Sequence, residues 1–403
     1  RTALMNYLIA RKAGGTFILR IDDTDPNRSE EKYVDAIKQD MEWLGLTWDK
    51  VERQSERLDQ YADAADKLRD IGRFYEAFET PTELDLKRKK QLNMGKPPVY
   101  DRAALDLTDA QKEAYLVIGR GEHSAISFEE KTGHDVIVGG LSKFLDSSPT
   151  IPKAAIVAVD VEHLCDLSTD LLKYGVKNIL VEKPAGLKGE EIESLHKLAS
   201  FKQADIFVAY NRRFFSSVIK ARDLIASDGG VRSFNFEFTE WGHVIGKLDK
   251  SAESLNRWFI ANSTHVVDLA FYLGGEPSDI SCFSGGGVDW HQVASKFSGA
   301  GMTTGGATFC YQADWESAGR WSVEILTSEN RYIFRPMEAL SVQRRGTVVT
   351  QVVDIDDSLD KEFKPGLYLQ VEAFLNNRTE QLCSLSSQHN MMATYEKIAG
   401  YAS

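Results

Sequence analysis

The sequence is poor in cysteine. Its 403 residues include four cysteines, and these lie far apart, at Cys165, Cys282, Cys310 and Cys383. No two of them form a C-x-x-C pair, so the pattern does not fit a structural zinc or iron–sulfur site, nor a disulfide scaffold. We therefore expect no metal site.

The sequence also lacks long apolar runs. No stretch of about 18 apolar residues is present, so we expect no membrane-spanning helix and no membrane partner. The first residues do not have the form of a signal peptide, which indicates a cytoplasmic protein. The chain starts at Arg1 rather than at methionine, and residues 2–10 already have a helical pattern, so we expect a fragment whose true start is missing.

Basic residues are outnumbered by acidic ones. The 48 Lys+Arg and 60 Asp+Glu give a net charge of −12, which argues against wrapping duplex DNA through a generally basic surface. The charge is uneven, because 43 of the first 115 residues are charged against 65 of the remaining 288. Only five of the 30 glycines fall in the first part. This shift predicts two parts with different histories.

The first part, residues 1–115, has a strand–helix pattern. Residues 16–21 predict a short buried strand, an acidic loop (Asp22 to Pro26) follows it, and Ser29 can cap the next helix. Carboxylates at the carboxyl end of a parallel strand can meet a ligand ammonium or a metal. A solvated turn whose carboxylates cap the next helix is the alternative.

Longer strings in this part are more specific. RTALMNYLIARKAGGTFILRIDDTDPNRS, DMEWLGLTWD and RQSERLDQYADAADKL strongly resemble bacterial glutamyl-tRNA synthetase. The resemblance implies a partial class I synthetase α/β fragment in which Asp22, with Arg20 and Thr24 in the same loop, helps bind the amino group of glutamate. The HIGH and KMSKS signatures are missing, so we expect ATP to bind only if this part were complete, and we expect no tRNA partner for this form.

The second part, residues 116–212, alternates strands with helices, which predicts a Rossmann-like doubly wound parallel sheet. A GxGxxS string between the first strand and helix (Gly119, Gly121 and Ser124) predicts a pyrophosphate site at a helix N-terminus. Residues 139–143 follow the second strand with two glycines and a lysine but no acid, which leans towards NADP over NAD. An ordinary glycine turn is the alternative.

The residues after the later strands of this part have a second resemblance. LLKYGVKNILVEKPAG and VAYNRRF resemble the glucose–fructose oxidoreductase/inositol dehydrogenase (Gfo/Idh/MocA) family. The resemblance implies that Lys183 lies near the nicotinamide and polarises the reacting hydroxyl, with Glu182 and Pro184 beside the cofactor. It places Tyr210 and Arg212 in the substrate site. A lysine at a strand end is otherwise a surface charge.

The third part, residues 213–403, predicts an α+β domain with an open antiparallel sheet. Residues 233–241 alternate phenylalanines on one face, and further strands are expected at residues 306–313, 321–327, 331–334 and 347–353. In some members of the resembled family such a sheet forms a dimer interface, which implies a homo-oligomer.

A helix expected over residues 258–273 places His265 and Asp268 on one face. It resembles the family's G-x-H-x-x-D helix, with Ser263 in place of the glycine. The resemblance makes His265 the general acid/base and puts Asn262 and Asp268 in the substrate site. A histidine simply paired with Asp268 is the alternative.

Together these patterns predict three domains, over residues 1–115, 116–212 and 213–403. The predicted function is an NAD(P)-dependent oxidoreductase acting on a small-molecule substrate: a sugar, a cyclitol or a related hydroxyl compound. A glutamyl-tRNA synthetase (glutamate–tRNA ligase) fragment is the first alternative. A fusion in which neither half works is the second.

Overall fold

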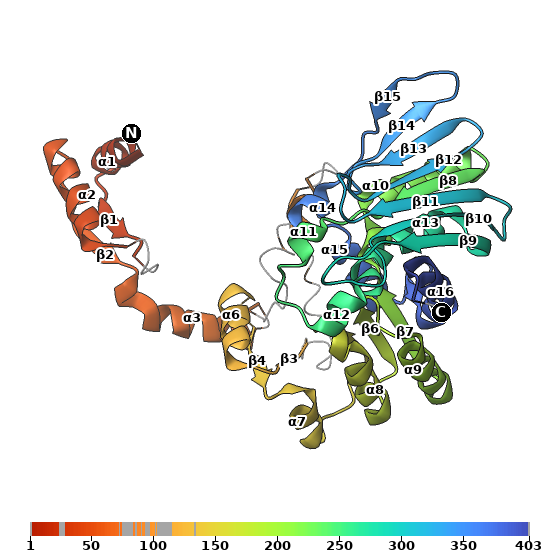
Figure 1. Ribbon diagram of the computed structural model, residues 1–403. Coiled ribbons are helices and arrows are strands. Elements are labelled where there is room, and N and C mark those ends of the chain that lie inside the picture. The colour runs from red at the N-terminus through yellow and green to blue at the C-terminus, as the bar shows by residue number, and fades with distance from the viewer. Residues whose placement is uncertain are drawn as a thin grey trace. The chain divides into compact units, whose positions relative to one another are not determined.

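The computed structural model of the chain divides into two units, Arg1–Leu116 and Val117–Ser403, and each is described by itself (Figure 1). The structure describes residues 2–23, 29–71, 73–74, 84, 87–89, 91–92, 97–100, 102, 115–132 and 134–401. None of the helices in these ranges combines the length and apolar character that a bilayer crossing requires.

The first unit contains the expected strand and helix, followed by a second strand that was not predicted. Strand β1 (Ile18–Ile21) pairs in parallel with β2 (Lys50–Arg53), and α2 (Glu31–Trp43) connects them. Helices α1 (Thr2–Lys12) and α3 (Leu58–Asp70), with the 3-10 turn Ser55–Arg57, complete its described elements.

The buried core of this unit is small. It consists of Phe17, Met41 and Leu46, with partly buried side chains around them. The N-cap of α2 is Glu30, which makes no side-chain capping bond, so the expectation that Ser29 caps this helix is wrong.

The second unit begins with parallel strands in two separate sheets, rather than in the one doubly wound sheet expected over residues 116–212. Strands β3 (Val117–Gly119) and β4 (Val136–Val138) pair with each other, and α6 (Glu122–Thr132) lies between them in the chain. The other sheet has the order β16-β7-β6-β5, in which β5, β6 and β7 are parallel. Its strands are β5 (Ala155–Val157), β6 (Asn178–Glu182), β7 (Asp205–Ala209) and β16 (Cys383–Ser384).

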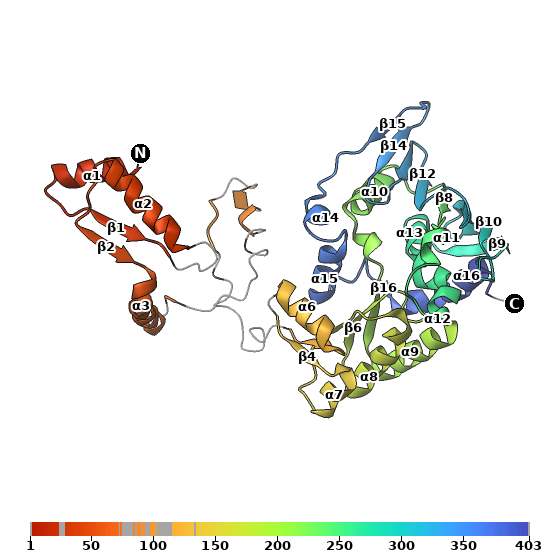
Figure 2. The same ribbon diagram turned by 60° about the vertical axis from the view of Figure 1, so that its left-hand side comes forward.

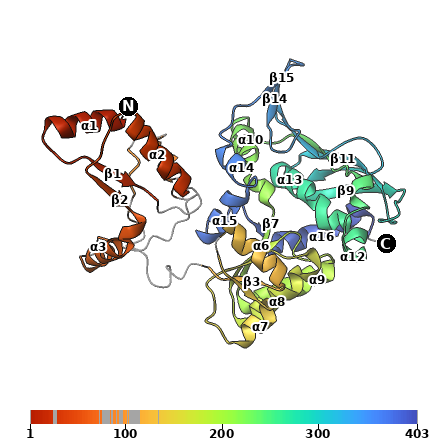
Figure 3. The ribbon, with the colours of Figure 1, turned by 90° about the vertical axis from the view of Figure 1, so that its left-hand side faces the viewer.

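Helices pack against these strands (Figures 2 and 3). Helix α8 contacts β5 and β6, and α16 contacts both α9 and β7. The helices and turns are α7 (Gly140–Asp146), the 3-10 turn Val161–His163, α8 (Leu164–Tyr174), α9 (Gly189–Lys202), the 3-10 turn η4 (Asn211–Phe214), α10 (Ser216–Ser227) and α16 (Leu385–Ala399). Gly175 ends α8 at a φ of +122°, as a helix-stopping glycine should.

An eight-stranded sheet dominates the rest of the unit (Figure 1). Its order is β15-β14-β13-β12-β8-β11-β10-β9. The strands are β8 (Ser233–Glu237), β9 (Pro277–Gly285), β10 (Lys296–Thr303), β11 (Thr308–Asp314), β12 (Ser322–Leu326), β13 (Asn330–Phe334), β14 (Ser341–Arg344) and β15 (Thr350–Val352). The sheet is mixed rather than wholly antiparallel, because β8 and β11 pair in parallel.

Helix α13 (Thr264–Gly274) covers one face of this sheet. Phe271 of α13 meets Phe309 with ring centroids 5.1 Å apart and Phe234 at 5.9 Å. A π-helical turn, η5 (Phe259–Ser263), precedes α13. The remaining helices are α11 (Gly242–Ile245), α12 (Ala252–Asn256), α14 (Ser358–Glu362) and α15 (Leu367–Leu375).

One hydrophobic cluster joins the parallel strands to the large sheet. It includes Leu164 and Val181 from the strand–helix region together with Phe238 and Val323 from the sheet region. Residues on both sides of position 212 therefore share a core, and the domain boundary expected there stays a prediction.

Candidate functional site

Lys183 follows β6 directly and reaches the turn that precedes α13. Its Nζ donates a hydrogen bond to the backbone carbonyl of Ala261 in η5. Burial lowers the pKa of Lys183 to about 8, against the opposing charge of Glu182, and the Arg212 charge lowers it further. The residue is therefore not the free surface charge that a lysine at a strand end usually is.

His265 lies in the first turn of α13. Its ring stands 6.0 Å from that of Tyr210 and 6.2 Å from that of Trp321. Burial lowers the pKa of His265 well below its usual value, and the charges of Arg212 and Lys183 add to the effect. The imidazole is neutral at pH 7, and its buried Nδ1 has no hydrogen-bond partner among the described residues.

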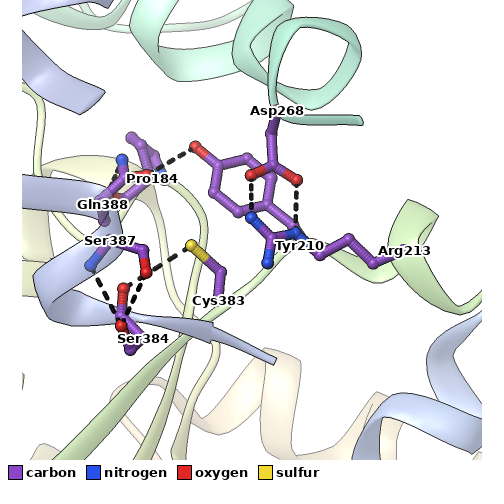
Figure 4. Close-up of polar contacts among 8 residues, drawn as sticks. All are labelled: Pro184, Tyr210, Arg213, Asp268, Cys383, Ser384, Ser387 and Gln388. Carbon is purple, nitrogen blue, oxygen red and sulfur yellow. Dashed lines mark hydrogen bonds and ion pairs between the residues drawn. The ribbon is translucent and has the colours of Figure 1, made fainter. Parts of the chain in front are cut away.

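Asp268 does not pair with His265. Its two carboxylate oxygens accept hydrogen bonds from Arg213, at 2.9 Å from Nε and 2.5 Å from the terminal nitrogen (Figure 4). Asp268 is 3% exposed, so this ion pair is buried. The pair joins η4 to α13 and leaves the imidazole free of the carboxylate.

Tyr210 connects three segments of the unit. Its hydroxyl donates to Gln388 Oε1 at 3.1 Å, and Gln388 Nε2 donates to the carbonyl of Pro184 at 3.1 Å (Figure 4). Tyr210 is almost fully buried, and burial raises the pKa of its hydroxyl. Its hydroxyl is thus already bonded to protein, and its expected contact with substrate stays a prediction.

Arg212 lies beside Trp321, with the guanidinium carbon 4.7 Å from the indole centroid. Arg320 lies at the same distance from that indole and forms an ion pair with Glu240 at 3.3 Å. Asn262 donates from its amide nitrogen to Glu240 Oε1 at 2.9 Å. Arg212, Glu240 and Trp321 therefore lie near His265 or Lys183, and Arg320 and Asn262 bind Glu240.

Glu240 is a site residue that was not predicted from the sequence. It is 1% exposed, and burial raises the pKa of its carboxyl while Ser263 Oγ, at 2.9 Å, favours the charged form. The sequence does contain a signal for this residue. Phe234, Phe236 and Phe238 alternate along the chain with their side chains buried, and Glu240 occupies the next position in that alternation. Nothing in the sequence marks its partner Arg320.

The glycine turn lies between β3 and α6. A Cβ on Gly119 would meet Val136 Cγ1 at 3.0 Å, whereas one on Gly121 would meet open space. Ser124 is exposed in the first turn of α6, and Arg120 contacts His163 Nε2 at 3.2 Å. This contact joins the turn to a residue that follows β5 in the chain.

These residues fit a dinucleotide only in part. The backbone at Gly121 is open to a phosphate, but Glu122 places a negative charge in the first turn of α6. At the end of β4, the Lys143 Nζ lies 3.3 Å from where a Gly139 Cβ would stand. In the described ranges, no group of three or more His, Cys, Asp or Glu side chains is placed to hold a metal ion.

The residues expected to bind glutamate lie in the first unit. Arg20 donates to both oxygens of Asp22, at 2.7 and 3.1 Å, and both side chains are more than half exposed. Thr24 lies outside the described residues. The pair is therefore an exposed ion pair at the carboxyl end of β1.

Comparison with known sequences finds relatives mainly of the first part of the chain. Residues 1–123 match the family model of class I tRNA synthetases (E and Q), catalytic domain. Glutamate–tRNA ligase 2 of Ruegeria sp. (strain TM1040) is 90% identical over 114 residues, 28% of this chain and 26% of that protein. Glutamate–tRNA ligase 1 of Roseobacter denitrificans is 86% identical over 188 residues, 45% of this chain and 41% of its own length.

The chain thus spans between about a quarter and two fifths of these curated relatives. The family match ends at residue 123 and so includes Gly119 and Gly121. The two glycines expected to hold a dinucleotide therefore also fall inside the synthetase-like stretch.

Comparison with solved structures concerns the fold. Levoglucosan dehydrogenase in complex with NADH and levoglucosan matches with a TM-score of 0.56 and 18% identity, covering 71% of this chain and 87% of that one. An inositol dehydrogenase homolog from Azotobacter vinelandii, with NADH and myo-inositol, matches with a TM-score of 0.57 and 16% identity, covering 72% and 88%. At these identities the likeness establishes the shared fold alone.

Proposed function

We propose that the second unit is an NAD(P)-dependent oxidoreductase acting on a hydroxyl group of a sugar, a cyclitol or a related compound. The observation that carries the proposal is the placement of Lys183 beside the turn that leads into His265, whose buried Nδ1 lacks a partner among the described residues. The NADH-bound dehydrogenases that share the fold support it.

His265 is the proposed proton acceptor. A neutral imidazole accepts the proton of a substrate hydroxyl as hydride leaves the same carbon, and the lowered pKa of His265 keeps the ring neutral at pH 7. Bound NAD(P) would supply the hydride acceptor. The neutral ring is therefore in the protonation state that removal of a hydroxyl proton requires.

Lys183 is the proposed polarising group. Its ammonium carries a positive charge near His265, which stabilises negative charge developing on the substrate oxygen. The hydrogen bond to Ala261 holds the ammonium in place. Asn262, fixed by its bond to Glu240, and Asp268, fixed by Arg213, keep the proposed role of framing the substrate.

The proposed dinucleotide site runs from the glycine turn to the EKP segment. Gly119, Gly121 and Ser124 would hold the pyrophosphate at the start of α6, and Glu182 and Pro184 would lie beside the nicotinamide. The Lys143 ammonium beside the glycines after β4 favours NADP. We propose two domains in this unit, residues 116–212 and 213–403. We also propose a homo-oligomer formed through the large sheet.

The first unit supports a second candidate, a glutamate–tRNA ligase fragment. Its identity of 90% to a curated ligase over 114 residues favours it. Glutamate-dependent ATP–pyrophosphate exchange by this chain would establish the candidate, and absence of exchange would remove it.

The proposal is tested by turnover of neutral and charged sugars, sugar alcohols and cyclitols with NAD and NADP, followed by nicotinamide absorbance. Lys183→Ala should abolish turnover while circular dichroism stays unchanged. Lys177→Ala is the matched control, because Lys177 also donates to a backbone carbonyl, that of Lys202, but is exposed. Undiminished turnover in Lys183→Ala would remove this residue from the site.

A further inference from the structure

Arg212 is a cation whose hydrogen-bonding capacity is not used. Its Nε is buried without a partner, and among the described residues the side chain forms no hydrogen bond or ion pair. Glu338 is exposed and acts on it only at a distance, and burial lowers the pKa of Arg212 to about 10. Buried guanidinium groups in proteins normally have hydrogen-bonded acceptors.

Trp321 adds a second unused donor at the same place. Its indole nitrogen is buried without a partner, and the residue is 6% exposed. Arg212 and Arg320 both lie over this indole at 4.7 Å, and the His265 ring is 6.2 Å from it. Two unsatisfied donors therefore lie next to the proposed proton acceptor.

The nearby carboxylates are already bound by other side chains and do not accept hydrogen bonds from Arg212 or Trp321. Glu240 is bound by Arg320, Asn262 and Ser263, and Asp268 is bound by Arg213. The exposed Lys364 adds a further positive charge that acts on His265.

Glu182, the carboxylate beside Lys183, is also bonded to protein, because one of its oxygens accepts from the backbone N–H of Lys183 at 3.2 Å. The acceptor that suits Arg212 and the indole N–H is therefore missing from the described part of the chain.

We infer that Arg212, with the indole N–H of Trp321, binds an anionic group of the substrate, a carboxylate or a phosphate carried by a sugar- or cyclitol-like molecule. The inference rests on the proposed function, since it names the substrate class of the same site. A planar guanidinium binds either group through two parallel hydrogen bonds, and such charged bonds are the stronger kind. The acceptor would satisfy both donors at once.

Calorimetric titration of the full chain tests this inference, with and without saturating NADH. The probes are D-glucuronate and D-glucose 6-phosphate, compared with neutral D-glucose and myo-inositol. We expect at least one anionic probe to bind about tenfold or more tightly than the neutral probes. Arg212→Met should remove that preference, and Arg222→Met should not, because Arg222 lies over Tyr272 instead.

A second variant guards against misfolding of Arg212→Met. Arg212→Lys keeps the charge but loses the planar pair of donors, so the preference should fall several-fold without vanishing. Comparable binding of all probes, no binding of any probe, or a preference that survives Arg212→Met would overturn the inference. A preference that depends on Arg212 in a chain that binds no NADH or NADPH would uphold the anion site and refute the oxidoreductase.

Discussion

The buried ammonium of Lys183 should lower the free energy of unfolding of the protein. Its pKa of about 8, against an ordinary value of 10.5, corresponds to about 3 kcal/mol lost at neutral pH, since each pKa unit is worth about 1.4 kcal/mol. Because the residue is partly exposed, this figure is an upper bound. Lys183→Met removes the charge but leaves the Ala261 carbonyl without its donor, at about 1 kcal/mol. A net stabilisation of up to about 2 kcal/mol follows at pH 7.

The pH dependence of this difference has a definite sign. Below pH 8 the lysine is charged in both the folded and the unfolded states, so the full cost is present. Between pH 8 and 10.5 only the unfolded state holds the proton, so the wild type gains free energy of unfolding relative to the variant as the pH rises. Above that range the charge no longer contributes to the difference.

Urea unfolding followed by tryptophan fluorescence at pH 7 and pH 10 measures both effects. Five of the seven tryptophans lie in the second unit, so the signal follows mainly the part that holds Lys183. Lys177→Met, an exposed lysine, should change stability little at either pH. If Lys183→Met is less stable than wild type at pH 7, the ammonium is not desolvated and the reasoning fails.

Three further predictions concern the same unit. In the oxidation direction, kcat/KM should fall as pH rises through about 8, because Lys183 then loses its proton; a pH–rate profile measures this. Asp268→Asn leaves Arg213 buried without its counter-charge and should lower the free energy of unfolding by about 3 to 5 kcal/mol in urea titrations. Gly274→Ala places a Cβ 2.3 Å from Phe234 and should cost about 1 to 3 kcal/mol, seen as a lower Tm.

Two of these predictions have matched control variants. Lys183→Arg keeps its proton to higher pH, so any remaining activity should no longer fall near pH 8. Gly305→Ala, whose Cβ would meet only Thr303 at 3.9 Å, should leave the Tm nearly unchanged. A flat pH profile, or wild-type stability in Asp268→Asn, would contradict the assigned environments of Lys183 and Asp268.

Strong local patterns predicted their elements well. The apolar run Asp205–Ala209 is β7 over the same residues, and the alternating phenylalanines lie buried in and just after β8. Strands β2, β9, β10, β14 and β16 were not predicted.

Strand β10 was not predicted for a physical reason: its glycines leave room for neighbouring aromatic rings. A Cβ on Gly299 would stand 2.4 Å from the Tyr311 hydroxyl, and one on Gly301 2.6 Å from the Phe309 ring. The sequence pattern that would have marked this strand is absent because aromatic residues of β11 fill the space.

The candidate site was predictable where a motif carried it and not elsewhere. Lys183 and His265 came from strings that resemble a family, and the structure brings them to one place. The partner of Asp268 could not be predicted from the sequence. Helical spacing favours His265 as that partner, and only the fold shows that Arg213 reaches Asp268. The parallel pairing of β8 with β11 depends on chain crossovers that no local pattern encodes.

The central claim is that the second unit binds a nicotinamide dinucleotide beside Lys183 and His265. Fluorescence titration of the full chain with NADH and with NADPH tests it most directly, with Lys183→Ala measured alongside. The account predicts saturable binding of at least one reduced dinucleotide below millimolar concentration, with nicotinamide emission that differs between wild type and Lys183→Ala. No saturable change with either dinucleotide up to millimolar concentration would contradict it.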